Sequence, residues 1–374
     1  MPPVVIDIRS AEDSRDVVHR AVQALAEGQV IAMPTETVYS LAASALDETA
    51  VARLLVAKRR AANVRPLTLA VKSCDDALDY VPQMNGLAQR LARRCWPGPV
   101  TLVCRDDHPA SVLTQLAPAV RAAVVPSGAI GLRVPAHPFF LDVMRMLAGP
   151  LAISSANRSG QTESKAAAEV VRALGDDVAM VLDDGESRFG CCSSVVRIDD
   201  HGFKLLRPGV VSEQTLRRLA NVVILFICTG NTCRSPMAEI IARQLLAERL
   251  GCQPDELEDR GVTVQSAGLS AMSGGGAASE AVDVMSEMGL DLSAHESRPL
   301  SDRLVRYADV IWTMTRMHRQ SVLARWPEAG PRTELLAVDQ MDIPDPIGSS
   351  PEVYRSCAKQ LRTELAARLS KLEL

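Results

Sequence analysis

The sequence predicts a two-domain α/β protein, and three observations carry that prediction. The chain has 374 residues, whereas a single hydrophobic core stops growing at about 250–300 residues, so two domains are expected. Short apolar runs alternate with longer stretches of helical period, which is typical of α/β folds. Hydrophobic residues make up 47% of the chain and charged residues 23%, which are ordinary proportions for a globular protein.

The overall charge and the cysteines bear on partners and compartment. A net charge of −4 gives no general reason to expect a polyanionic partner, so any contact with nucleic acid would have to be local. The nine cysteines are odd in number and irregularly spaced, which is typical of free thiols in a reducing compartment. The N-terminus does not resemble a signal peptide, and no uncharged run reaches the roughly 20 residues that span a bilayer. We therefore expect a cytoplasmic protein without membrane contact.

The first domain is expected at residues 1–211. Its apolar runs are separated by helical patterns in an order that indicates a mixed, twisted sheet covered by helices. The expected strands are Val30–Met33, Leu67–Val71, Val100–Val103 and Leu151–Ile153, and the expected helices include Ala50–Lys58 and Leu87–Cys95.

The second domain is expected at residues 222–374, after a polar, helix-like linker at residues 212–221. Strand, loop and helix follow one another repeatedly, which is the signature of a doubly wound parallel sheet. The expected strands are Val222–Ile227, Val262–Gln265 and Val310–Thr313.

The first strand of the second domain runs directly into a candidate phosphate-binding loop. Residues 228–235 read Cys-Thr-Gly-Asn-Thr-Cys-Arg-Ser, and Pro236 and a helical run follow. Proline is favoured in the first turn of a helix, whose free N–H groups and positive dipole end bind anions. Gly230 permits the tight curvature of the loop. The expected phosphate-binding residues are Thr229, Gly230, Asn231, Thr232, Cys233 and Ser235.

The same loop supplies candidates for nucleophilic catalysis. Cys228 lies among main-chain dipoles and near a guanidinium, both of which favour the nucleophilic thiolate, and Ser235 can hydrogen-bond that thiolate. Arg234 can pair two phosphoryl oxygens with its planar fork and stabilise the charge of an in-line displacement. The leaving group needs a proton, and Asp345 before Pro346 is the candidate general acid.

Three motifs in order carry a family resemblance of the second domain. Cys-x5-Arg-Ser at residues 228–235, Ser266-Ala267-Gly268 and the late Asp345-Pro346 resemble the low-molecular-weight protein phosphatase family over about 150 residues. The resemblance implies a phosphocysteine intermediate, phosphorylated proteins as substrates and no cofactor.

Two details bear on which phosphorylated residue is the substrate. Tyrosine-directed members of the family carry aromatic residues after the Asp-Pro, whereas this chain has Ile347 and Gly348. The loop, with Thr232 two residues before Arg234, is similar to that of bacterial protein-arginine phosphatases. The resemblance therefore favours phosphoarginine, with phosphotyrosine as the alternative because specificity rests on few contacts.

The first domain has no Gly-x4-Gly-Lys-Ser/Thr loop but carries a series of polar clusters. They are Pro34–Tyr39, Lys58–Arg60, Trp96–Thr101, Gly131–Pro135, Ser154–Gly160, Ser193–Val196 and Leu206–Gly209. In their order and in their residue types, these clusters resemble the threonylcarbamoyl-adenylate synthase family, also described as YrdC-like, over about residues 15–210. The resemblance implies that L-threonine, bicarbonate and ATP react to threonylcarbamoyl-AMP and pyrophosphate, for the threonylcarbamoyladenosine modification of tRNA. Mg²⁺ is implied by the triphosphate.

The resemblance also implies a set of ligand-binding residues. Positive charge is the main requirement for holding a triphosphate and a carbamate, and the expected cations are Lys58, Arg60 and Arg207. The remaining expected L-threonine and ATP ligands are Thr35, Thr101, Arg133, Ser155, Asn157 and Ser193.

Some positions depart from the family pattern and leave alternatives open. Ser40 replaces a glycine, Ala61 a proline and Cys192 a proline. We expect a bifunctional synthase and phosphatase. One alternative is a phosphotyrosine phosphatase whose first domain binds a nucleotide or RNA without turnover, through the basic residues around Lys58 and Arg65. A fusion in which one domain only scaffolds the other is a third hypothesis.

Overall fold

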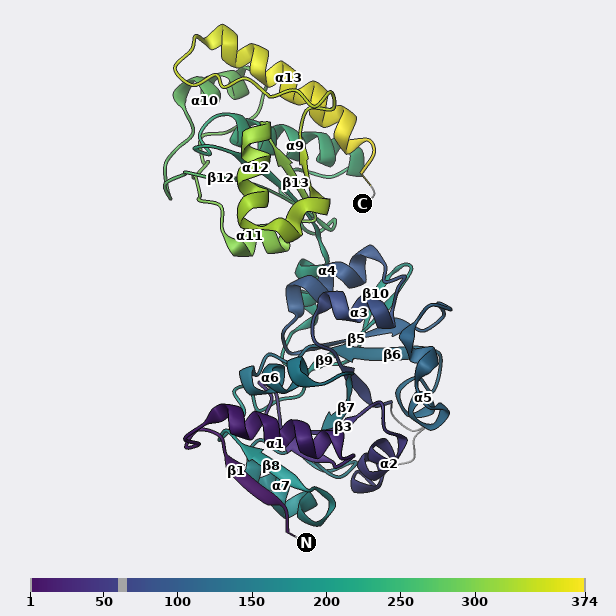
Figure 1. Cartoon of the computed structure of the whole chain (residues 1–374). Helices are drawn as coiled ribbons and strands as arrows, with labels where there is room; N and C mark the ends of the chain where they lie inside the picture. The colour runs from purple at the N-terminus through teal and green to yellow at the C-terminus, as the bar shows by residue number, and fades with distance from the viewer. Residues whose placement is uncertain (1, 60–65, 373–374) are drawn as a thin grey trace. The chain divides into compact units, whose positions relative to one another are not determined.

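The computed structural model describes residues 2–59 and 66–372. The chain divides into two compact units, residues 1–216 and 217–374, which are shown in Figure 1. The division falls within the expected linker, whose residues form helix α8 (Glu213–Ala220). Within the described residues, no helix combines the length and the apolar character needed to cross a membrane.

The first unit is built on one ten-stranded sheet in the order β1-β8-β2-β3-β7-β4-β6-β5-β9-β10. The sheet contains both parallel pairs, such as β4–β6 and β5–β9, and antiparallel pairs, such as β3–β7 and β9–β10, so the predicted mixed sheet is confirmed. The strands are β1 (Val4–Asp7), β2 (Ile31–Met33), β3 (Ser40–Ser44), β4 (Thr68–Ala70), β5 (Val100–Arg105), β6 (Ala129–Arg133), β7 (Leu151–Ser155), β8 (Met180–Asp183), β9 (Ser194–Asp199) and β10 (Gly202–Arg207).

Side-chain caps and an apolar face explain where the helices of this unit begin and pack. Asp13 caps α1 and Asp47 caps α2 by accepting hydrogen bonds from main-chain N–H groups of the first turn, which satisfies donors that the helix itself leaves free. Helices α1 and α6 pack their apolar side chains on the sheet around Ile31 and Ile153. The helices are α1 (Ser14–Ala26), α2 (Glu48–Ala57), α3 (Cys74–Tyr80), α4 (Gly86–Cys95), α5 (Pro118–Val124), α6 (Pro138–Met146) and α7 (Ala167–Leu174).

The second unit has a four-stranded, fully parallel sheet in the order β12-β11-β13-β14. Its strands are β11 (Val222–Cys228), β12 (Val262–Gly268), β13 (Val310–Thr313) and β14 (Thr333–Leu335). Its helices are α9 (Arg234–Leu250), α10 (Ser279–Glu287), α11 (Asp302–Tyr307), α12 (Arg316–Arg325) and α13 (Pro351–Leu369).

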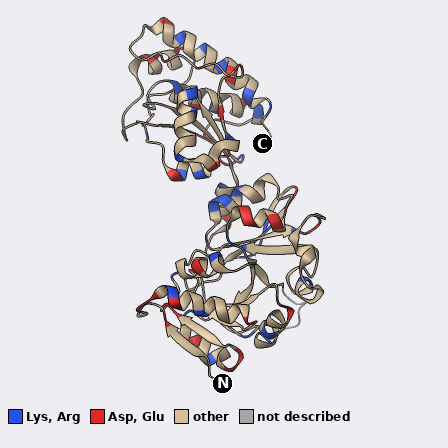
Figure 2. Ribbon diagram, viewed as in Figure 1, with Lys and Arg blue, Asp and Glu red and all other residues tan. Residues whose placement is uncertain are grey.

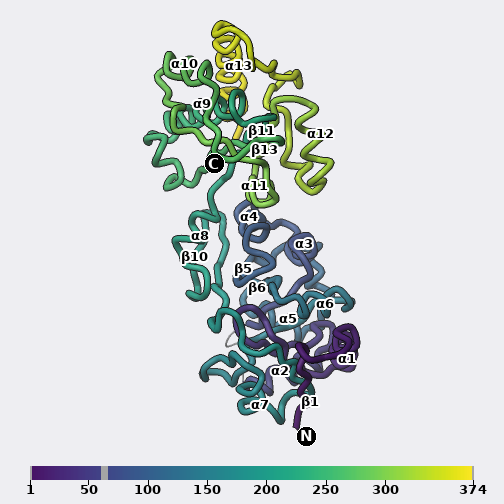
Figure 3. The backbone as a smooth tube through the Cα atoms, turned by 90° about the vertical axis from the view of Figure 1, so that its left-hand side faces the viewer, coloured from purple at the N-terminus to yellow at the C-terminus, as the bar shows by residue number. Residues whose placement is uncertain are grey.

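Both faces of this parallel sheet are buried. On the central strand β11, Ile224 and Phe226 pack into a core formed with α9, α10 and α13. Leu225 and Ile227 point to the opposite face and pack with α11 and α12. Figure 3 shows β11 between α9 and α12. Successive side chains of a strand point to opposite faces, so the unbroken apolar run of β11 requires cover on both, and the predicted doubly wound sheet is confirmed.

Candidate active sites

The loop between β11 and α9 is shaped by one buried asparagine. Asn231 has a positive φ of 57°, a left-handed conformation that asparagine tolerates better than most residues. Its side-chain Nδ2 donates to Oγ of Ser235 at 3.0 Å and to Oγ of Ser266 at 2.8 Å. Its Oδ1 accepts from the backbone N of Arg298 at 2.9 Å. The asparagine therefore ties the loop to the first turn of α9, to β12 and to the segment that follows α10.

A neighbouring strand approaches this loop closely. A Cβ atom on Gly268 would lie 2.5 Å from the carbonyl oxygen of Thr229, so only glycine fits there. The N–H of Ser270 donates to the same carbonyl oxygen at 2.9 Å. These contacts explain why a Ser-Ala-Gly sequence ends the strand beside the loop.

The sulfur of Cys228 lies within hydrogen-bond distance of two polar atoms that follow it in the chain. Its Sγ lies 3.2 Å from the donating backbone N of Asn231 and 2.9 Å from Oγ of Ser235. Cys228 is buried and is the last residue of the central strand β11. Helix α9 begins six residues later, at Arg234. The ionised thiolate is the nucleophilic form of cysteine. The predicted contact between Cys228 and Ser235 is present.

The structure brings together the predicted guanidinium and the predicted acid, which lie far apart in the sequence. Arg234 forms an ion pair with Asp345 through Nη2 and Oδ2 and donates from Nη1 to the carbonyl oxygen of Ile343 at 3.1 Å. The Arg234 side chain is 5% exposed and that of Asp345 is 41% exposed. The predicted acid is therefore partly exposed and lies next to the buried cation.

The remaining loop residues differ in where their side chains point. Thr229 is exposed and Thr232 is half-buried. The buried Sγ of Cys233 lies 3.4 Å from the hydroxyl of Tyr354 on α13, so the expected phosphate-binding role of Cys233 concerns its main chain. Sequence reasoning missed Tyr354, because nothing in the sequence relates it to the loop.

The first unit contains a polar cavity of about 250 Å³ that collects most of the predicted ligand-binding residues. Lys58, Thr101, Arg133, Ser155, Asn157, Ser193 and Arg207 all line it. They come from the end of α2 and from strands β5, β6, β7 and β10, with their adjoining loops. Ser40 of β3 also lines the cavity and is paired with Ser155 of β7 in the sheet.

Lys58 is held inside this cavity by oxygen atoms of one segment. Its Nζ donates to the carbonyl oxygen of Ser155 at 2.7 Å, to Oδ1 of Asn157 at 2.9 Å and to the carbonyl oxygen of Asn157. The residue is 3% exposed. A buried ammonium requires such partners because its removal from water is costly. Lys58 and the Ser155–Asn157 segment, which were predicted separately, are therefore joined by hydrogen bonds in one part of the cavity.

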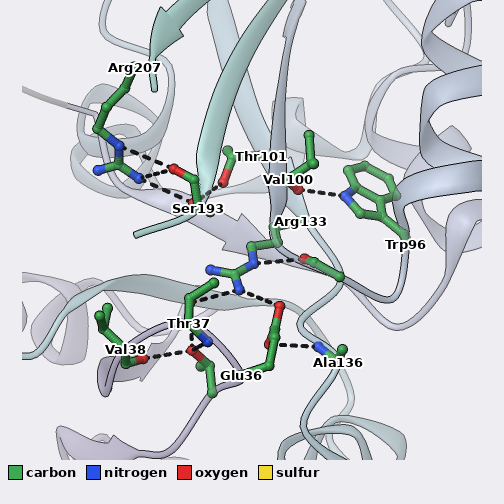
Figure 4. A network of polar contacts seen from close by, with 12 residues as sticks. Glu36, Thr37, Val38, Trp96, Val100, Thr101, Arg133, Ala136, Ser193 and Arg207 are labelled. Carbon is green, nitrogen blue, oxygen red and sulfur yellow. Dashed lines mark hydrogen bonds and ion pairs between the residues drawn. The ribbon is translucent and has the colours of Figure 1, made fainter. Parts of the chain in front are cut away.

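Arg133 is oriented by an acidic residue that sequence reasoning did not single out. Its Nη2 donates to Oε1 of Glu36 at 2.7 Å and to Oγ1 of Thr37 at 2.9 Å, and both charged side chains are buried. The second oxygen of Glu36 accepts from the backbone N of Ala136 at 2.9 Å. Figure 4 shows this network around the guanidinium. The motif that contains Glu36 was recognised, but its pairing with Arg133, 97 residues away, was not.

A second network joins the last predicted cation to two hydroxyls. Arg207 donates from Nη2 to the carbonyl oxygen of Ser193 at 2.9 Å and to its Oγ at 3.1 Å. Oγ of Ser193 lies 3.0 Å from Oγ1 of Thr101, as Figure 4 shows. Three residues, from β5, from β10 and from the position just before β9, thus line the cavity together.

Two predicted ligand-binding residues are not placed in the cavity. Thr35 is buried, and its hydroxyl donates to the carbonyl oxygen of Val38 at 2.6 Å and lies 2.8 Å from Oγ1 of Thr37. Thr37 and Val38 line the cavity instead. Thr35 lies behind them and holds this turn in place through its hydrogen bonds. Arg60 lies outside the described residues, as do Ala61 and Arg65.

A carboxyl and a thiol complete the cavity lining. Sγ of Cys192 donates to Oε1 of Glu163 at 3.1 Å. Burial and this neighbouring carboxyl raise the pKa of Cys192 to about 12. Burial opposes ionisation of Glu163, but the hydrogen bond from Cys192 and the charges of Arg207 and Lys58 hold its pKa below the usual value. Glu163 therefore presents a carboxylate to an otherwise cationic cavity.

Two family models match the chain. The model Sua5_yciO_yrdC, described as "Telomere recombination", matches residues 23–209. The model described as "Low molecular weight phosphotyrosine protein phosphatase" matches residues 223–373.

Curated relatives match one unit each. A threonylcarbamoyl-AMP synthase of Pyrococcus abyssi is 34% identical over 195 residues, which are 52% of this chain and 54% of that protein. The chain thus spans about half of that relative. The mouse threonylcarbamoyl-AMP synthase is 33% identical over 54% of this chain and 69% of its own length. A protein-arginine-phosphatase of Bacillus subtilis is 36% identical over 153 residues, which are 40% of this chain and 93% of that protein.

A solved structure supports the fold of the first unit. The crystal structure of P. abyssi Sua5 complexed with L-threonine has a TM-score of 0.52 and 23% sequence identity, and the match covers 71% of this chain and 92% of that chain. At this identity the likeness concerns the fold alone.

Proposed function

We propose that this chain, which belongs to the Sua5/YciO/YrdC family over residues 23–209 and to the low-molecular-weight phosphatase family over residues 223–373, is a bifunctional enzyme. The first unit, through the expected domain at residues 1–211, forms threonylcarbamoyl-AMP from L-threonine, bicarbonate and ATP and releases pyrophosphate. The second unit, through the expected domain at residues 222–374, hydrolyses phosphorylated proteins through a phosphocysteine intermediate.

The observation that carries the first activity is the polar cavity with three cations from separate elements. Lys58, Arg133 and Arg207 converge on it, and positive charge is the main requirement for holding a triphosphate and a carbamate. Fixed cations in a buried site neutralise phosphate oxygens without reorganisation and hold the carbamate near the α-phosphorus of ATP. Thr101, Ser155, Asn157 and Ser193 add hydroxyl and amide groups that orient the nucleotide and the amino acid.

The cavity also fits the Mg²⁺ that accompanies a triphosphate. Mg²⁺ is usually held by one or two carboxylates together with substrate phosphates and water. Glu163 is ionised and lines the cavity, and no cluster of three or more metal-ligating side chains occurs in residues 2–59 and 66–372. Glu163 would therefore hold the ion together with ATP, and the ion would neutralise triphosphate charge.

The test of this activity is pyrophosphate release from ATP, measured with and without L-threonine and bicarbonate. We expect release that requires both, and a loss of at least about a hundredfold in Lys58→Ala, because the variant removes a buried charge from the phosphate site. Lys204→Ala is the matched control, since Lys204 is exposed on β10 outside the cavity. Release independent of threonine would contradict the proposal.

An RNA-binding role without turnover is the alternative for the first unit. It would use basic residues on an accessible surface, but Lys58 is buried within the cavity, which favours a small ligand. Figure 2 shows acidic and basic residues interspersed along the helices of this unit, which is also unlike a nucleic-acid surface. Salt-dependent RNA binding without pyrophosphate release would support the alternative.

The observation that carries the second activity is the hydrogen-bonded thiol of Cys228 beside Arg234 and Asp345. The thiolate attacks phosphorus and forms a sulfur–phosphorus bond, while the bond from phosphorus to the leaving group breaks. Once it is released from Arg234 and protonated from solvent, Asp345 gives its proton to that leaving group and then takes one from the water that hydrolyses the phosphocysteine, which releases phosphate. Arg234 must exchange its contact with Asp345 for the phosphoryl oxygens.

Phosphoarginine is the substrate that the loop favours over phosphotyrosine. Ile347 is 64% exposed and Gly348 follows it, so no aromatic ring flanks the acid at this position to stack on a phenol. Thr232 offers a hydroxyl at the position two before Arg234. The relative from B. subtilis is a protein-arginine-phosphatase, which supports the same choice.

One experiment distinguishes phosphoarginine from phosphotyrosine as the substrate. The purified chain is assayed on phosphoarginine and phosphotyrosine, with Cys228→Ser as the blank, Thr232→Ile as the selectivity probe and Thr232→Ser as its matched control. We expect a phosphoarginine preference that Thr232→Ile reduces and Thr232→Ser keeps. A phosphotyrosine preference of the wild-type chain would establish the alternative substrate.

A further inference from the structure

A histidine outside the phosphate loop contacts the residue that follows the nucleophile. His318 lies in the first turn of α12, where its backbone N donates to Oγ1 of the capping Thr315 at 3.2 Å. Its side chain is buried, and Nε2 lies 2.9 Å from Oγ1 of Thr229. Thr229 is itself exposed and directly follows Cys228. The imidazole thus contacts the hydroxyl of an exposed residue next to Cys228.

The surroundings of His318 keep its ring neutral. Burial, and then the positive charge of Arg234, lower the pKa of His318 to about 4, against the opposing effect of Asp345 and Asp342. A neutral imidazole carries one N–H donor and one acceptor nitrogen. Nε2 and Nδ1 of His318 must therefore have opposite roles.

The two nitrogens differ in their partners. Nδ1 of His318 is buried, and none of the described residues provides it with a hydrogen-bond partner. A buried N–H without an acceptor is rarer in proteins than a buried acceptor without a donor. This places the proton on Nε2, which then donates to Oγ1 of Thr229. Because that oxygen already accepts a hydrogen bond, the hydroxyl proton of Thr229 remains for another acceptor.

We propose that His318 is a positioning residue that turns the hydroxyl of Thr229 into an additional hydrogen-bond donor for the phosphoryl group. The proposal rests on the phosphatase function proposed above. Main-chain N–H groups and Arg234 hold the phosphoryl oxygens in the loop, and the hydroxyl adds a donor beside the nucleophile. A donor that is already oriented strengthens as the oxygens gain charge in the transition state.

A double-mutant cycle tests whether His318 acts through Thr229. The four proteins are the wild-type chain, His318→Leu, Thr229→Val and the double variant, each assayed for kcat/KM and for binding of inorganic phosphate by calorimetry. We expect each single variant to lose about tenfold or more in kcat/KM, because a hydrogen bond to a charged group is lost. The double variant should lose no more than Thr229→Val alone, because the histidine has no other route to the substrate.

Conservative variants separate this role from packing. His318→Gln can still donate from a position near Nε2, and Thr229→Ser keeps the hydroxyl, so both should retain most of the activity. His201→Leu is the matched control, since His201 is exposed in the other unit. Additive losses in the cycle, or a His318→Gln as weak as His318→Leu, would assign His318 a packing role and overturn the proposal.

NMR spectroscopy determines which ring nitrogen of His318 carries the proton, and it does not require a measurement of enzymatic activity. Long-range ¹H–¹⁵N NMR correlations of the wild-type chain should show the His318 proton on Nε2 at neutral pH. A proton on Nδ1 would make Nε2 an acceptor for Thr229 and overturn the proposal. If the wild-type chain hydrolysed neither substrate, the phosphatase function would fail instead, and phosphate binding together with the NMR result would still decide the role of His318.

Discussion

Replacing Asn231 should unfold the phosphate loop before it affects any other part of the protein. In Asn231→Ala, the two hydrogen bonds to Ser235 and Ser266 and the one from Arg298 are lost. At about 1 kcal/mol for each hydrogen bond, this amounts to about 3 kcal/mol. The positive φ of 57° adds about 1 kcal/mol, because alanine tolerates the left-handed region less well than asparagine. We expect a total loss of about 4 kcal/mol in the second unit.

Asn231→Gly separates the two contributions, since glycine loses the hydrogen bonds but adopts a positive φ without strain. It should be about 1 kcal/mol more stable than Asn231→Ala. Urea unfolding followed by tryptophan fluorescence measures both values. In a Trp96→Phe background the signal comes from Trp312 and Trp326, which both lie in the second unit. If Asn231→Ala were as stable as the wild-type chain, or more stable than Asn231→Gly, the role given to this side chain would be wrong.

Three further predictions concern the ion pair, the independence of the units and the effect of pH. Glu36→Gln should destabilise the first unit by about 3 kcal/mol in urea unfolding, because it leaves the buried guanidinium of Arg133 without a charged partner; a change below 1 kcal/mol would contradict this. Cys228→Ser should lose all phosphatase activity and keep threonine-dependent pyrophosphate release, so parallel loss of both would refute independent sites. The unfolded chain protonates His318 below about pH 6.5 and the folded one only near pH 4, so stability should fall between these values as the pH drops. His318→Gln should show a smaller fall in the same titration.

The parts of the protein that could be read from the sequence depend on local interactions. The candidate phosphate loop, its candidate nucleophile and the following helix lie within about 20 consecutive residues, so their geometry follows from one strand, one turn and one helix start. Unbroken apolar runs such as Val222–Ile227 indicate strands buried on both faces, and the parallel sheet confirmed them. The predicted helices and strands of the first unit were confirmed for the same reason, with boundaries shifted by a few residues.

The features that the sequence did not reveal concern residues that meet only in the folded chain. Thr35 belongs to the correct motif, but the turn directs its hydroxyl to Val38 rather than into the cavity. The contact of His318 with Thr229 joins residues 89 positions apart. Histidine at the start of a helix is unremarkable in a sequence, so no local signal could have identified it.

The sequence by itself therefore determined the two α/β units, the candidate phosphate loop with its candidate nucleophile, and the set of cations available to the first unit. These features rest on hydrophobic period and on short motifs, which act over a few neighbouring residues. Only the tertiary structure decided which side chains share a site: Glu36 with Arg133, Asp345 with Arg234, and His318 with Thr229. Such pairings follow from the order of strands in a sheet, and that order is set by packing across the whole chain rather than by any single segment.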